Sequence, residues 1–256
     1  MWLIYGCSTG LGKSLVDALI AKGDYVAVLT RTPDAVRKGV LAFDSTNLEP
    51  SDLAAAVMGT MQKFGRIDVL VNNAGYGAFG KVEDVTPSGL ADQFRVNFFA
   101  CATLMRLVIP IMRLQRSGRI INVSSIGALH PFPESGAYNA SKAALSAMSQ
   151  SADQELEGTG VRAINVMPGA LRTAFKGENF RAFGSSEGVK GFVESVGTEL
   201  GDPAKAANAL IKLVEMDGAP RNVLLGSDAV AMASDALATA LAEVASNEAL
   251  SRSTDG

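Results

Sequence analysis

The sequence predicts a doubly wound α/β fold, a parallel sheet of about seven strands with helices on both faces, built as one domain over residues 1–256. Three observations support it. Short apolar runs alternate with segments of helical periodicity along the chain. The apolar runs are continuous, as expected of strands buried on both faces. Each run also ends in small or polar residues, as at the ligand-binding edge of such a sheet.

The first predicted strand, residues 2–5, leads into a glycine-rich loop and a helix. Gly6, Gly10 and Gly12 let another group approach the backbone closely. Helical spacing of apolar residues then runs as far as Gly23, which closes the helix. A glycine loop at a helix N-terminus is an anion site, and we expect it to take a pyrophosphate. The spacing G-x-x-x-G-x-G differs from the usual dinucleotide fingerprint, so the loop alone leaves a plain turn open.

The remaining elements follow the alternation typical of a Rossmann-type sheet. Further strands are expected at residues 25–30, 40–43, 67–75, 118–125, 160–169 and 222–226. Further helices are expected at residues 49–64, about 89–115, 138–156 and 203–215, before a polar helix and tail. The poorly patterned residues, about 170–202, predict a long functional loop.

The composition is that of an ordinary soluble chain. It is 48% hydrophobic, and its net charge of -3 argues against nucleic acid or an anionic membrane as partner. Its two cysteines form no disulfide framework and indicate a reducing compartment. The first strand begins at Trp2, which leaves no room for a targeting peptide, and the apolar stretch at residues 97–112 is too short to span a bilayer. We expect a cytoplasmic protein, and no metal site is predicted.

The predicted strand ends carry motifs that resemble the short-chain dehydrogenase/reductase family over essentially the whole chain. In the family's order and spacing, they are the glycine loop, Asn72-Asn73-Ala74-Gly75, Asn97, Ser125, Tyr138-x-x-x-Lys142 and Pro168-Gly169. The chain leaves no room for the added substrate domain of the epimerase-like branch. Its Tyr–Lys spacing also differs from that of the enoyl-reductase branch. The resemblance implies a nicotinamide-dependent oxidoreductase.

The chemistry of the predicted catalytic set follows from the side chains. Tyr138 and Lys142 are four residues apart at the start of a helix, hence on one face. An ammonium group favours the phenolate form of a neighbouring tyrosine, so Tyr138 can act as general acid for carbonyl reduction and as base for alcohol oxidation. Ser125 is expected to hydrogen-bond the reacting oxygen. By the resemblance, Lys142 also holds the nicotinamide ribose, and Asn97 holds a water that passes protons to Lys142.

The resemblance also implies a set of dinucleotide-binding residues. Besides Tyr138 and Lys142, these are Gly6, Ser8, Thr9, Gly10, Leu11, Gly12, Arg31, Asp44, Ser45, Asn73, Ala74, Gly75, Pro168, Gly169, Leu171 and Thr173.

Several of these residues have a structural alternative. Ser125, next to Ser124, could be a loop hydroxyl or helix cap, and Asn97 could simply bond the sheet backbone. Asp44 could open a turn. His130, the only histidine, lies in a proline-rich stretch that suggests a stiff loop, and we do not predict it to be catalytic.

One residue departs from the family pattern. Tyr5 stands where the family usually has a threonine whose hydroxyl ties the glycine loop to backbone. The longer side chain cannot imitate that bond in place. The departure concerns the rigidity of the loop and the affinity for cofactor, and it leaves the catalytic set untouched.

The end of the second strand predicts the choice of cofactor. Thr30 stands at the position where an acidic residue would select NAD, and Arg31 follows it. A guanidinium can donate two hydrogen bonds to a 2′-phosphate, so we predict NADP(H) over NAD(H). An exposed arginine in a turn is the alternative. Thr9 stands where many NADP-using relatives have a second basic residue, so the preference is not expected to be absolute.

The substrate and the oligomeric state are predicted from apolar side chains. An apolar lid over the nicotinamide would favour a hydrophobic ketone, aldehyde or alcohol, whereas the alternative is that the same side chains anchor the loop. The candidates are Phe175, Phe180, Phe183 and Phe192 in the loop, with Leu129 and Phe132 after Ser125. A homodimer or homotetramer is predicted to form through residues 98–112 and the small-residue face Ala140, Ala143, Ala144 and Ala147.

Taken together, the motifs predict an NADP(H)-dependent oxidoreductase that interconverts a carbonyl and an alcohol. The alternative is a non-catalytic, dinucleotide-binding redox sensor on the same fold. The complete set of Asn97, Ser125, Tyr138 and Lys142 favours the enzyme, because a sensor needs no proton relay.

Overall fold

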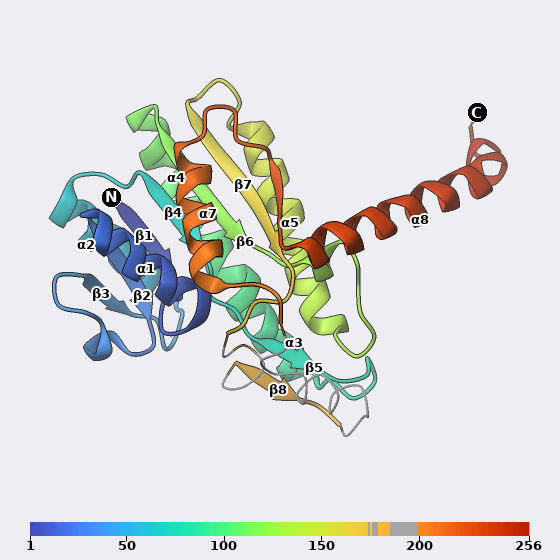
Figure 1. Ribbon diagram of the computed structural model, residues 1–256, viewed down its shortest axis with the longest axis horizontal. Helices are drawn as coiled ribbons and strands as arrows, with labels where there is room; N and C mark the ends of the chain where they lie inside the picture. Colours follow the sequence, from blue (N-terminus) through green and yellow to red (C-terminus); the bar gives the residue numbers. More distant parts are fainter. Residues whose placement is uncertain (174, 176–178, 185–198, 256) are drawn as a thin grey trace.

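A seven-stranded parallel sheet forms the centre of the computed structural model, which describes residues 1–173, 175, 179–184 and 199–255. The strand order is β3-β2-β1-β4-β6-β7-β9 (Figure 1). The strands are β1 (Trp2–Tyr5), β2 (Val26–Thr30), β3 (Leu41–Asp44), β4 (Val69–Asn72), β6 (Gly118–Val123), β7 (Val161–Pro168) and β9 (Asn222–Leu225). The predicted doubly wound fold is confirmed, and every strand predicted for the sheet is present.

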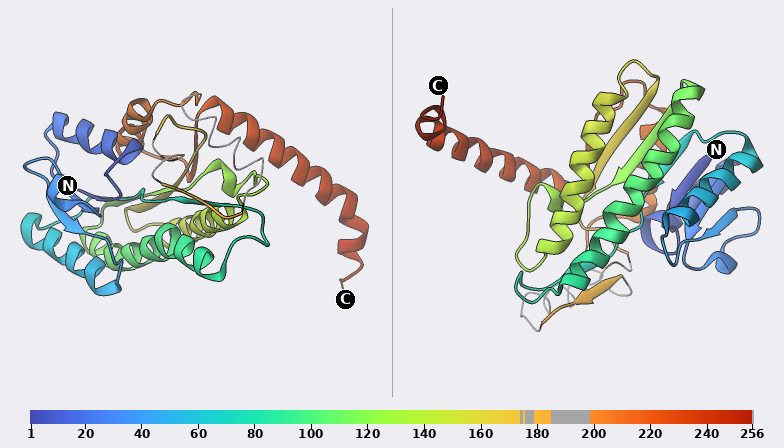
Figure 2. Two further views of the ribbon diagram at one scale, coloured as in Figure 1. Left: turned by 90° about the horizontal axis from the view of Figure 1, so that it is seen from below. Right: turned by 180° about the vertical axis from the view of Figure 1, so that it is seen from behind.

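Helices cover both faces of this sheet (Figure 2). On one face lie α1 (Gly10–Lys22) and α7 (Pro203–Glu215), which pack against each other. On the other face lie α2 (Pro50–Phe64), α4 (Ala100–Gln115) and α5 (Gly136–Glu155). Alternate strand residues enter one core or the other, as Ile4 and Leu3 do. The strands therefore read as continuous apolar runs.

The helix predicted at about residues 89–115 consists of three segments. Helix α3 (Pro87–Phe94) begins at Thr86, whose hydroxyl accepts a hydrogen bond of 3.1 Å from the Gly89 N–H. One π-helical turn (Arg95–Phe99) follows before α4 begins. Such turns are rare and frequently mark functional sites. Here the turn directs Asn97 into the protein, where it is fully buried.

A second, two-stranded sheet was not predicted. Strand β5 (Gly77–Phe79) pairs in parallel with β8 (Phe180–Ala182), with Gly77 opposite Phe180. The sequence prediction of an irregular loop over residues 170–202 was therefore wrong for β8. Both strands are too short to show periodicity, and their partners are distant in sequence.

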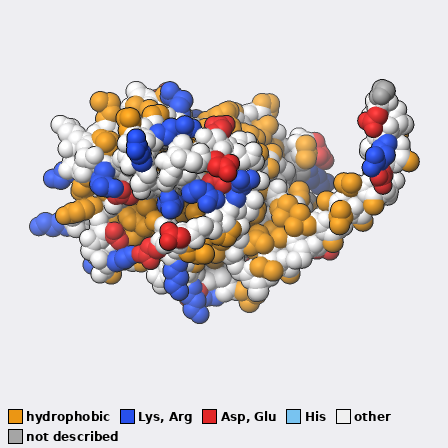
Figure 3. All heavy atoms as spheres, turned by 90° about the horizontal axis from the view of Figure 1, so that it is seen from above, with side chains coloured by type: hydrophobic (Ala, Val, Ile, Leu, Met, Phe, Trp, Pro, Cys, Tyr) orange, Lys and Arg blue, Asp and Glu red, His pale blue; other side chains and the backbone are white. Residues whose placement is uncertain are grey.

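The prediction of a polar helix and tail at the end of the chain was also incomplete. Residues Ser227–Arg252 form one long helix, α8, that projects from the body of the protein (Figure 1). Its first turns are anchored by Ala229 and Ala233, which pack against Ile126. Figure 3 shows hydrophobic side chains along the projecting part, where the exposed apolar residues are Leu237, Leu241, Val244 and Leu250.

In the part of the chain that the structure describes, two helical segments have the length and apolar composition of a membrane-crossing helix, Pro87–Gln115 and Ser227–Arg252. The first includes α4, which packs on the central sheet and contributes Leu104, Val108 and Met112 to its core.

Asparagines form a row across four neighbouring strands, and all of them except Asn222 at the edge are buried. Asn72 of β4, Asn122 of β6, Asn165 of β7 and Asn222 of β9 occupy matching register positions. The Asn72 amide donates to Asn122 Oδ1 at 2.7 Å, and the Asn165 amide donates to Asn222 Oδ1 at 2.9 Å. We call these four residues the asparagine row.

The asparagine row also holds helix α5. The Asn122 amide donates to Ser149 Oγ at 2.9 Å, and the Ser146 hydroxyl donates to Asn165 Oδ1 at 3.1 Å. Ser146 also lies 2.8 Å from the hydroxyl of Ser124, which in turn donates to the Lys142 carbonyl. Because buried polar groups must find partners, these bonds fix the position of α5 along the sheet.

A buried carboxylate fixes the last turn of α5. Asp153 accepts hydrogen bonds from Arg162 Nε at 2.7 Å and Arg221 Nε at 3.0 Å, and from the Ala163 N–H at 3.1 Å. Burial alone raises the pKa of Asp153, but these hydrogen bonds outweigh it and hold the pKa below its ordinary value of 3.8. Asp153 therefore joins α5 to β7 and to the start of β9.

We expect Asp153→Ala to lower the free energy of unfolding at neutral pH by about 3 kcal/mol, because it leaves two guanidinium groups without their partner. The full difference in unfolding free energy between parent and variant should be present above about pH 5. Below the unfolded-state pKa of the aspartate this difference should shrink, because Asp153 becomes protonated in the parent and its hydrogen bonds to the two arginines are lost. Urea unfolding at several pH values measures it. Asp235→Ala, at an exposed position of α8, is the control; an equal loss in both variants would contradict this role.

Candidate active site

A cavity of about 500 Å³ opens at the carboxyl ends of the sheet strands. The chain runs outward from β1 to β2 and β3 and then returns to place β4 on the other side of β1. The strand order thus reverses between β1 and β4, the usual ligand-binding position in doubly wound sheets. The cavity has the size of a small-molecule site.

The glycine loop after β1 closes one side of this cavity. A Cβ atom on Gly6 would lie 2.4 Å from Ala74 Cα, and one on Gly12 would lie 2.0 Å from the Gly6 carbonyl oxygen. Gly6 also has a φ of +90°, which favours glycine. The Asn73 amide donates to that same carbonyl oxygen at 2.6 Å. The loop is therefore packed tightly against the segment after β4.

The N-terminus of α1 fits an anionic group. Thr9 is the N-cap residue, its side chain accepts no hydrogen bond from the helix, and the first turn carries no acidic residue. The free N–H groups and the positive end of the helix dipole consequently face the cavity, which Thr9, Gly10 and Leu11 line. The residues present thus fit the pyrophosphate predicted from the sequence.

Tyr5 does not replace the missing threonine. Its ring is buried, and its hydroxyl donates to the Val96 carbonyl at 3.4 Å, on the helix side of the sheet. Its backbone carbonyl instead accepts from the N–H groups of Asn73 and Ala74, at 3.0 and 2.7 Å. Together with the hydrogen bond from the Asn73 amide to the Gly6 carbonyl, these bonds hold the glycine loop against the segment after β4 without a threonine hydroxyl.

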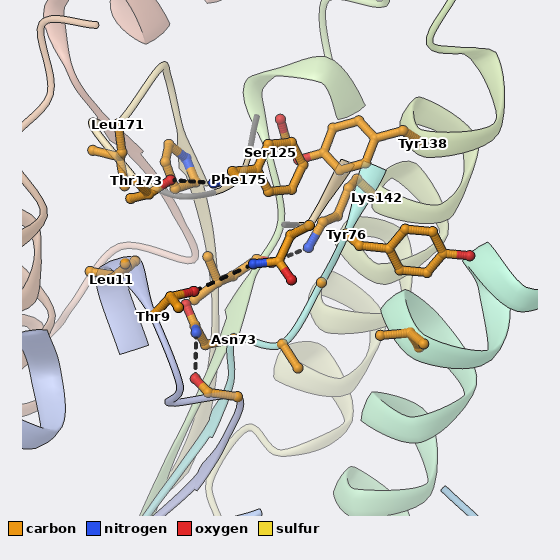
Figure 4. Close-up of a pocket in the computed structure, with 18 of the residues that line it drawn as sticks. Thr9, Leu11, Asn73, Tyr76, Ser125, Tyr138, Lys142, Leu171, Thr173 and Phe175 are labelled. Atoms are coloured by element: carbon orange, nitrogen blue, oxygen red, sulfur yellow. Dashed lines mark hydrogen bonds between the residues drawn. The ribbon is translucent and has the colours of Figure 1, made fainter. Parts of the chain in front are cut away.

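The end of β2 brings Arg31 to the cavity. Thr30 is buried, and its hydroxyl lies 2.8 Å from that of Ser8. Arg31 is exposed and donates from Nη2 to Asn179 Oδ1 at 3.3 Å. The Asn179 amide in turn donates to Thr9 Oγ1 at 3.4 Å, a bond drawn in Figure 4. Asn179 was missed by sequence reasoning, because nothing local marks it.

Ser125, Tyr138 and Lys142 line the other end of the same cavity (Figure 4). Lys142 is buried and donates from Nζ to the Val123 carbonyl at 2.8 Å. Ser125 accepts from the Gly127 N–H at 3.1 Å, and its side chain lies beside Tyr138, whose pKa it lowers. Ser125 is also the N-cap of a short 3₁₀ turn, Ile126–Ala128, which is the helix-cap role that the sequence left open. Ser124 faces α5, where its hydroxyl donates to the Lys142 carbonyl.

Burial governs the ionisation of the two central groups. Burial raises the pKa of Tyr138 to about 12, and the hydrogen bond with Ser125 acts in the opposite sense. Burial lowers the pKa of Lys142 to about 8, with a small opposing effect of Cys101. The sequence analysis expected the Lys142 ammonium to favour the phenolate. In this structure Lys142 bonds Val123 and has no such effect on Tyr138, which remains a neutral phenol.

Asn97 lies behind the cavity rather than in its wall. Its amide donates to the Tyr76 carbonyl and to Ser141 Oγ, both at 3.1 Å, and its Oδ1 accepts from the Tyr76 N–H at 3.2 Å. The side chain thus binds backbone, the alternative that the sequence left open. It still lies close to Lys142: a Cβ on Gly75 would be 3.2 Å from Lys142 Nζ and 3.3 Å from Asn97 Oδ1.

Most of the predicted cofactor-binding residues come together in this cavity. Two do not line it. The Asp44 carboxylate accepts from the N–H and hydroxyl of Thr46, at 2.9 and 2.6 Å, so it opens a turn as the alternative held. Gly12 lies behind the loop. The predicted residues in the wall are Gly6, Ser8, Thr9, Gly10, Leu11, Arg31, Ser45, Asn73, Ala74, Gly75, Ser125, Tyr138, Lys142, Pro168, Gly169, Leu171 and Thr173.

Aromatic rings surround Tyr138. The ring centroids of Phe79 and Phe175 lie 5.7 and 5.4 Å from that of Tyr138, and Phe180 stacks on Phe79 at 5.2 Å. Of the other predicted apolar residues, Phe132 lines the cavity and Leu129 packs near α8. Phe183 packs between Gly80 and Gly89, so it anchors the segment, and Phe192 lies outside the described residues.

Other walls of the cavity were not anticipated. Tyr76 lies under the Arg181 guanidinium, 4.8 Å from its ring centroid, and α8 contributes Asp228 and Met232. His130 packs against Phe132 outside the cavity wall. Within the described part of the chain, no group of three or more potential metal ligands is found.

Relatives and solved structures agree with this geometry. The chain is 32% identical to an oxidoreductase, BOA17, of Botryotinia fuckeliana over 92% of each chain. It is 35% identical to a 3-ketodihydrosphingosine reductase of Bacteroides thetaiotaomicron over 68% of this chain and 64% of that protein. A short-chain dehydrogenase from Streptomyces avermitilis matches with a TM-score of 0.92 and 32% identity, over 100% and 98% of the chains.

Two further structures contain cofactors. A short-chain dehydrogenase of Burkholderia cenocepacia in complex with NADP matches with a TM-score of 0.77 and 26% identity, over 95% of each chain. A 3-ketoacyl-(acyl-carrier-protein) reductase of Brucella melitensis, complexed with NADH, matches with a TM-score of 0.74 and 26% identity, over 88% and 96%. The family model described as short chain dehydrogenase matches residues 1–182, so this chain belongs to the short-chain dehydrogenase family of oxidoreductases.

Proposed function

We propose that this protein is an NADP(H)-dependent oxidoreductase that interconverts a ketone or aldehyde and an alcohol on a hydrophobic substrate. One observation carries the proposal. Ser125, Tyr138 and Lys142 meet at one end of a cavity whose other end is an uncapped helix N-terminus at Thr9. A dinucleotide bound by its pyrophosphate at that N-terminus can extend to the tyrosine.

The nicotinamide, when bound, supplies the hydride. The chain's residues manage the proton and the developing charge. Tyr138 keeps its proton at neutral pH because burial raises its pKa to about 12, and it can therefore donate that proton to the oxygen of a carbonyl substrate. Ser125, which lines the same end of the cavity as Tyr138, is placed to donate to the same oxygen as negative charge develops there.

Lys142 supports this step from the cavity wall. With a pKa of about 8, its amine can exchange a proton near neutral pH. Its Nζ faces Gly75 on the cavity side and shares that corner with the Asn97 amide. This arrangement supports the family roles, in which the lysine holds the nicotinamide ribose and the asparagine serves the proton path.

Arg31 supports NADP(H) as the cofactor. The two related structures that are each 26% identical to this chain hold NADP in one case and NADH in the other. Similarity to them therefore does not decide which cofactor this protein uses. Arg31 is an exposed cation beside the end of β2, and Thr30 supplies no carboxylate there to repel a 2′-phosphate.

The rings around Tyr138 support a hydrophobic substrate. Phe79 and Phe175 flank the phenol, and Phe132 adds to the apolar wall. The Bacteroides relative is named for a 3-keto lipid, which is a ketone of this kind. We expect small charged substrates such as hydroxy acids to react poorly, because their desolvation in such a wall is unfavourable.

We also propose a cytoplasmic homodimer or homotetramer. Leu114 on α4 is 88% exposed, Ala140 and Ala147 on α5 are exposed, and so is the nearby Met148. These helices present an apolar, small-residue surface suited to a symmetry-related copy. Both cysteines are free thiols, in keeping with a reducing compartment.

The first test is the tyrosine. Tyr138→Phe should lower kcat for carbonyl reduction by about a thousandfold, because it removes the general acid and leaves the ring packing intact. The cofactor dissociation constant should change by less than about threefold, since the phenol is not its main anchor. A panel of apolar ketones and aldehydes, followed by NADPH oxidation, supplies the substrate. Equal turnover by parent and variant would contradict the mechanism and favour the sensor.

The second test is the pH dependence of cofactor binding. Affinity for NADPH should weaken above about pH 8, because the Lys142 ammonium then loses the proton with which it donates to the ribose. Titrations by calorimetry across that pH measure it. Lys142→Met should bind weakly with no such transition, and Tyr138→Phe should retain it. A flat profile in the parent protein would contradict the assignment.

The third test concerns Arg31. The parent should prefer NADPH over NADH by about tenfold to a hundredfold in kcat/KM, equivalent to about 1.4 to 3 kcal/mol of differential binding. Replacing Thr30 by Asp and Arg31 by Ala should reverse this order, whereas Arg31→Ala alone should only remove the preference. A parent that uses NADH equally well would show that Arg31 is merely a surface residue.

A further inference from the structure

The base of α8 reaches the turn that follows β7. Asp228, in the first turn of that helix, accepts a hydrogen bond of 2.7 Å from the Ala170 N–H. Its carboxylate is half-buried and forms part of the cavity wall, as do Pro168 and Gly169. The contact joins residues 58 positions apart in the sequence.

The turn is shaped around this carboxylate. A Cβ on Gly169 would lie 2.3 Å from both carboxylate oxygens of Asp228, and one on Gly226 would lie 2.4 Å from Oδ1. For Gly169, the three nearest atoms all belong to Asp228. The φ of Gly169 is not positive, so backbone freedom does not explain the glycine. A side chain at residue 169 would meet the Asp228 carboxylate, which would have to move and loosen its bond to Ala170.

The position of this turn matters for one end of the cofactor. The loop at Gly10 takes the pyrophosphate, and Arg31 marks the adenosine side. The opposite end of the cavity holds Tyr138 and Ser125, where hydride transfer requires the nicotinamide to meet the substrate. The Pro168-Gly169 turn belongs to this end, on the neighbouring strand β7.

We propose that Asp228 is a positioning residue for the nicotinamide: it holds the turn at residues 168–170 in place by accepting from Ala170, and it touches neither substrate nor reacting atoms. This inference rests on the proposed dinucleotide cofactor. The same stretch of α8 packs Ala229 and Ala233 on Ile126, next to Ser125. The base of α8 thus packs behind two walls of the cavity at the end where Tyr138 and Ser125 lie. It does so although α8 comes last in the sequence.

The test compares two ligands that differ only at the nicotinamide. NADPH and 2′-phospho-ADP-ribose share every group except the nicotinamide ring, as do NADH and ADP-ribose. Asp228→Ala should weaken NADPH binding by about tenfold, the scale of one lost hydrogen bond to a charged acceptor. Binding of 2′-phospho-ADP-ribose should change by less than about twofold, since it lacks the nicotinamide ring that the turn is proposed to position.

Two companion variants separate positioning from general stability. Asp228→Asn keeps an oxygen acceptor for the Ala170 N–H and should restore NADPH affinity to within about threefold of the parent. Asp235→Ala, exposed on the same helix, should leave both affinities unchanged. Helix content and thermal unfolding of each variant show whether α8 is intact.

A double-mutant cycle tests the packing directly. Gly169→Ala should weaken NADPH binding strongly in the parent, because its methyl group meets the Asp228 carboxylate. The same substitution should be milder when Asp228 is already Ala, so that the two effects are not additive.

The outcomes are distinct from those that test the proposed function. If the parent protein binds neither dinucleotide, the proposed function fails. If it binds one of them, the inference is overturned by equal weakening of both ligands in Asp228→Ala, by an Asn variant as weak as Ala, or by additive effects in the cycle. A selective, Asn-rescued and non-additive loss supports it.

Discussion

The asparagine row is the constraint on which the site depends. Three buried amides and one exposed amide at matching register cross β4, β6, β7 and β9, and each buried amide requires a partner. Two of those partners are serines of α5, so the helix cannot slide along the sheet without leaving amides unpaired. Unpaired buried groups are costly, at about 1 to 3 kcal/mol each. Tyr138 and Lys142 lie on this helix, and their distance from the sheet is therefore set by polar contacts rather than by apolar packing alone.

The position of α5 also determines the ionisation of Tyr138 and Lys142. Because α5 is held against the sheet, Lys142 is buried with its amine on the Val123 carbonyl, and the Tyr138 ring is enclosed by Phe79 and Phe175. Burial disfavours charge on both groups, which raises one pKa to about 12 and lowers the other to about 8. At neutral pH the tyrosine therefore keeps its proton, and the pH lies close to the pKa of the lysine. Both properties follow from the packing of one helix.

The sequence predicted the sheet and the main site because their signals are local. Strand-length apolar runs, glycines at strand ends and a Tyr-x-x-x-Lys pair can all be read within a few residues. The missed features are contacts between distant segments: Asn179 with Thr9, Asp228 with Ala170, and β5 with β8. The asparagine row did leave a signal, since Asn122 and Asn165 interrupt two apolar strands, while Asn72 ends a third and Asn222 begins a fourth. Recognising it required knowing that these strands are neighbours in register, which only the fold reveals.

The two ends of the cavity are held in different ways. At the adenosine end, Arg31 is exposed, and the bonds through Asn179 are long, at 3.3 and 3.4 Å. Exposed contacts of this kind contribute little and are readily exchanged for a ligand's own groups. At the reacting end, Lys142 and the Ala170 turn are held by bonds of 2.8 and 2.7 Å to groups that the chain itself supplies. Recognition can therefore adjust to the cofactor, whereas the groups that must meet the substrate are in place before it binds.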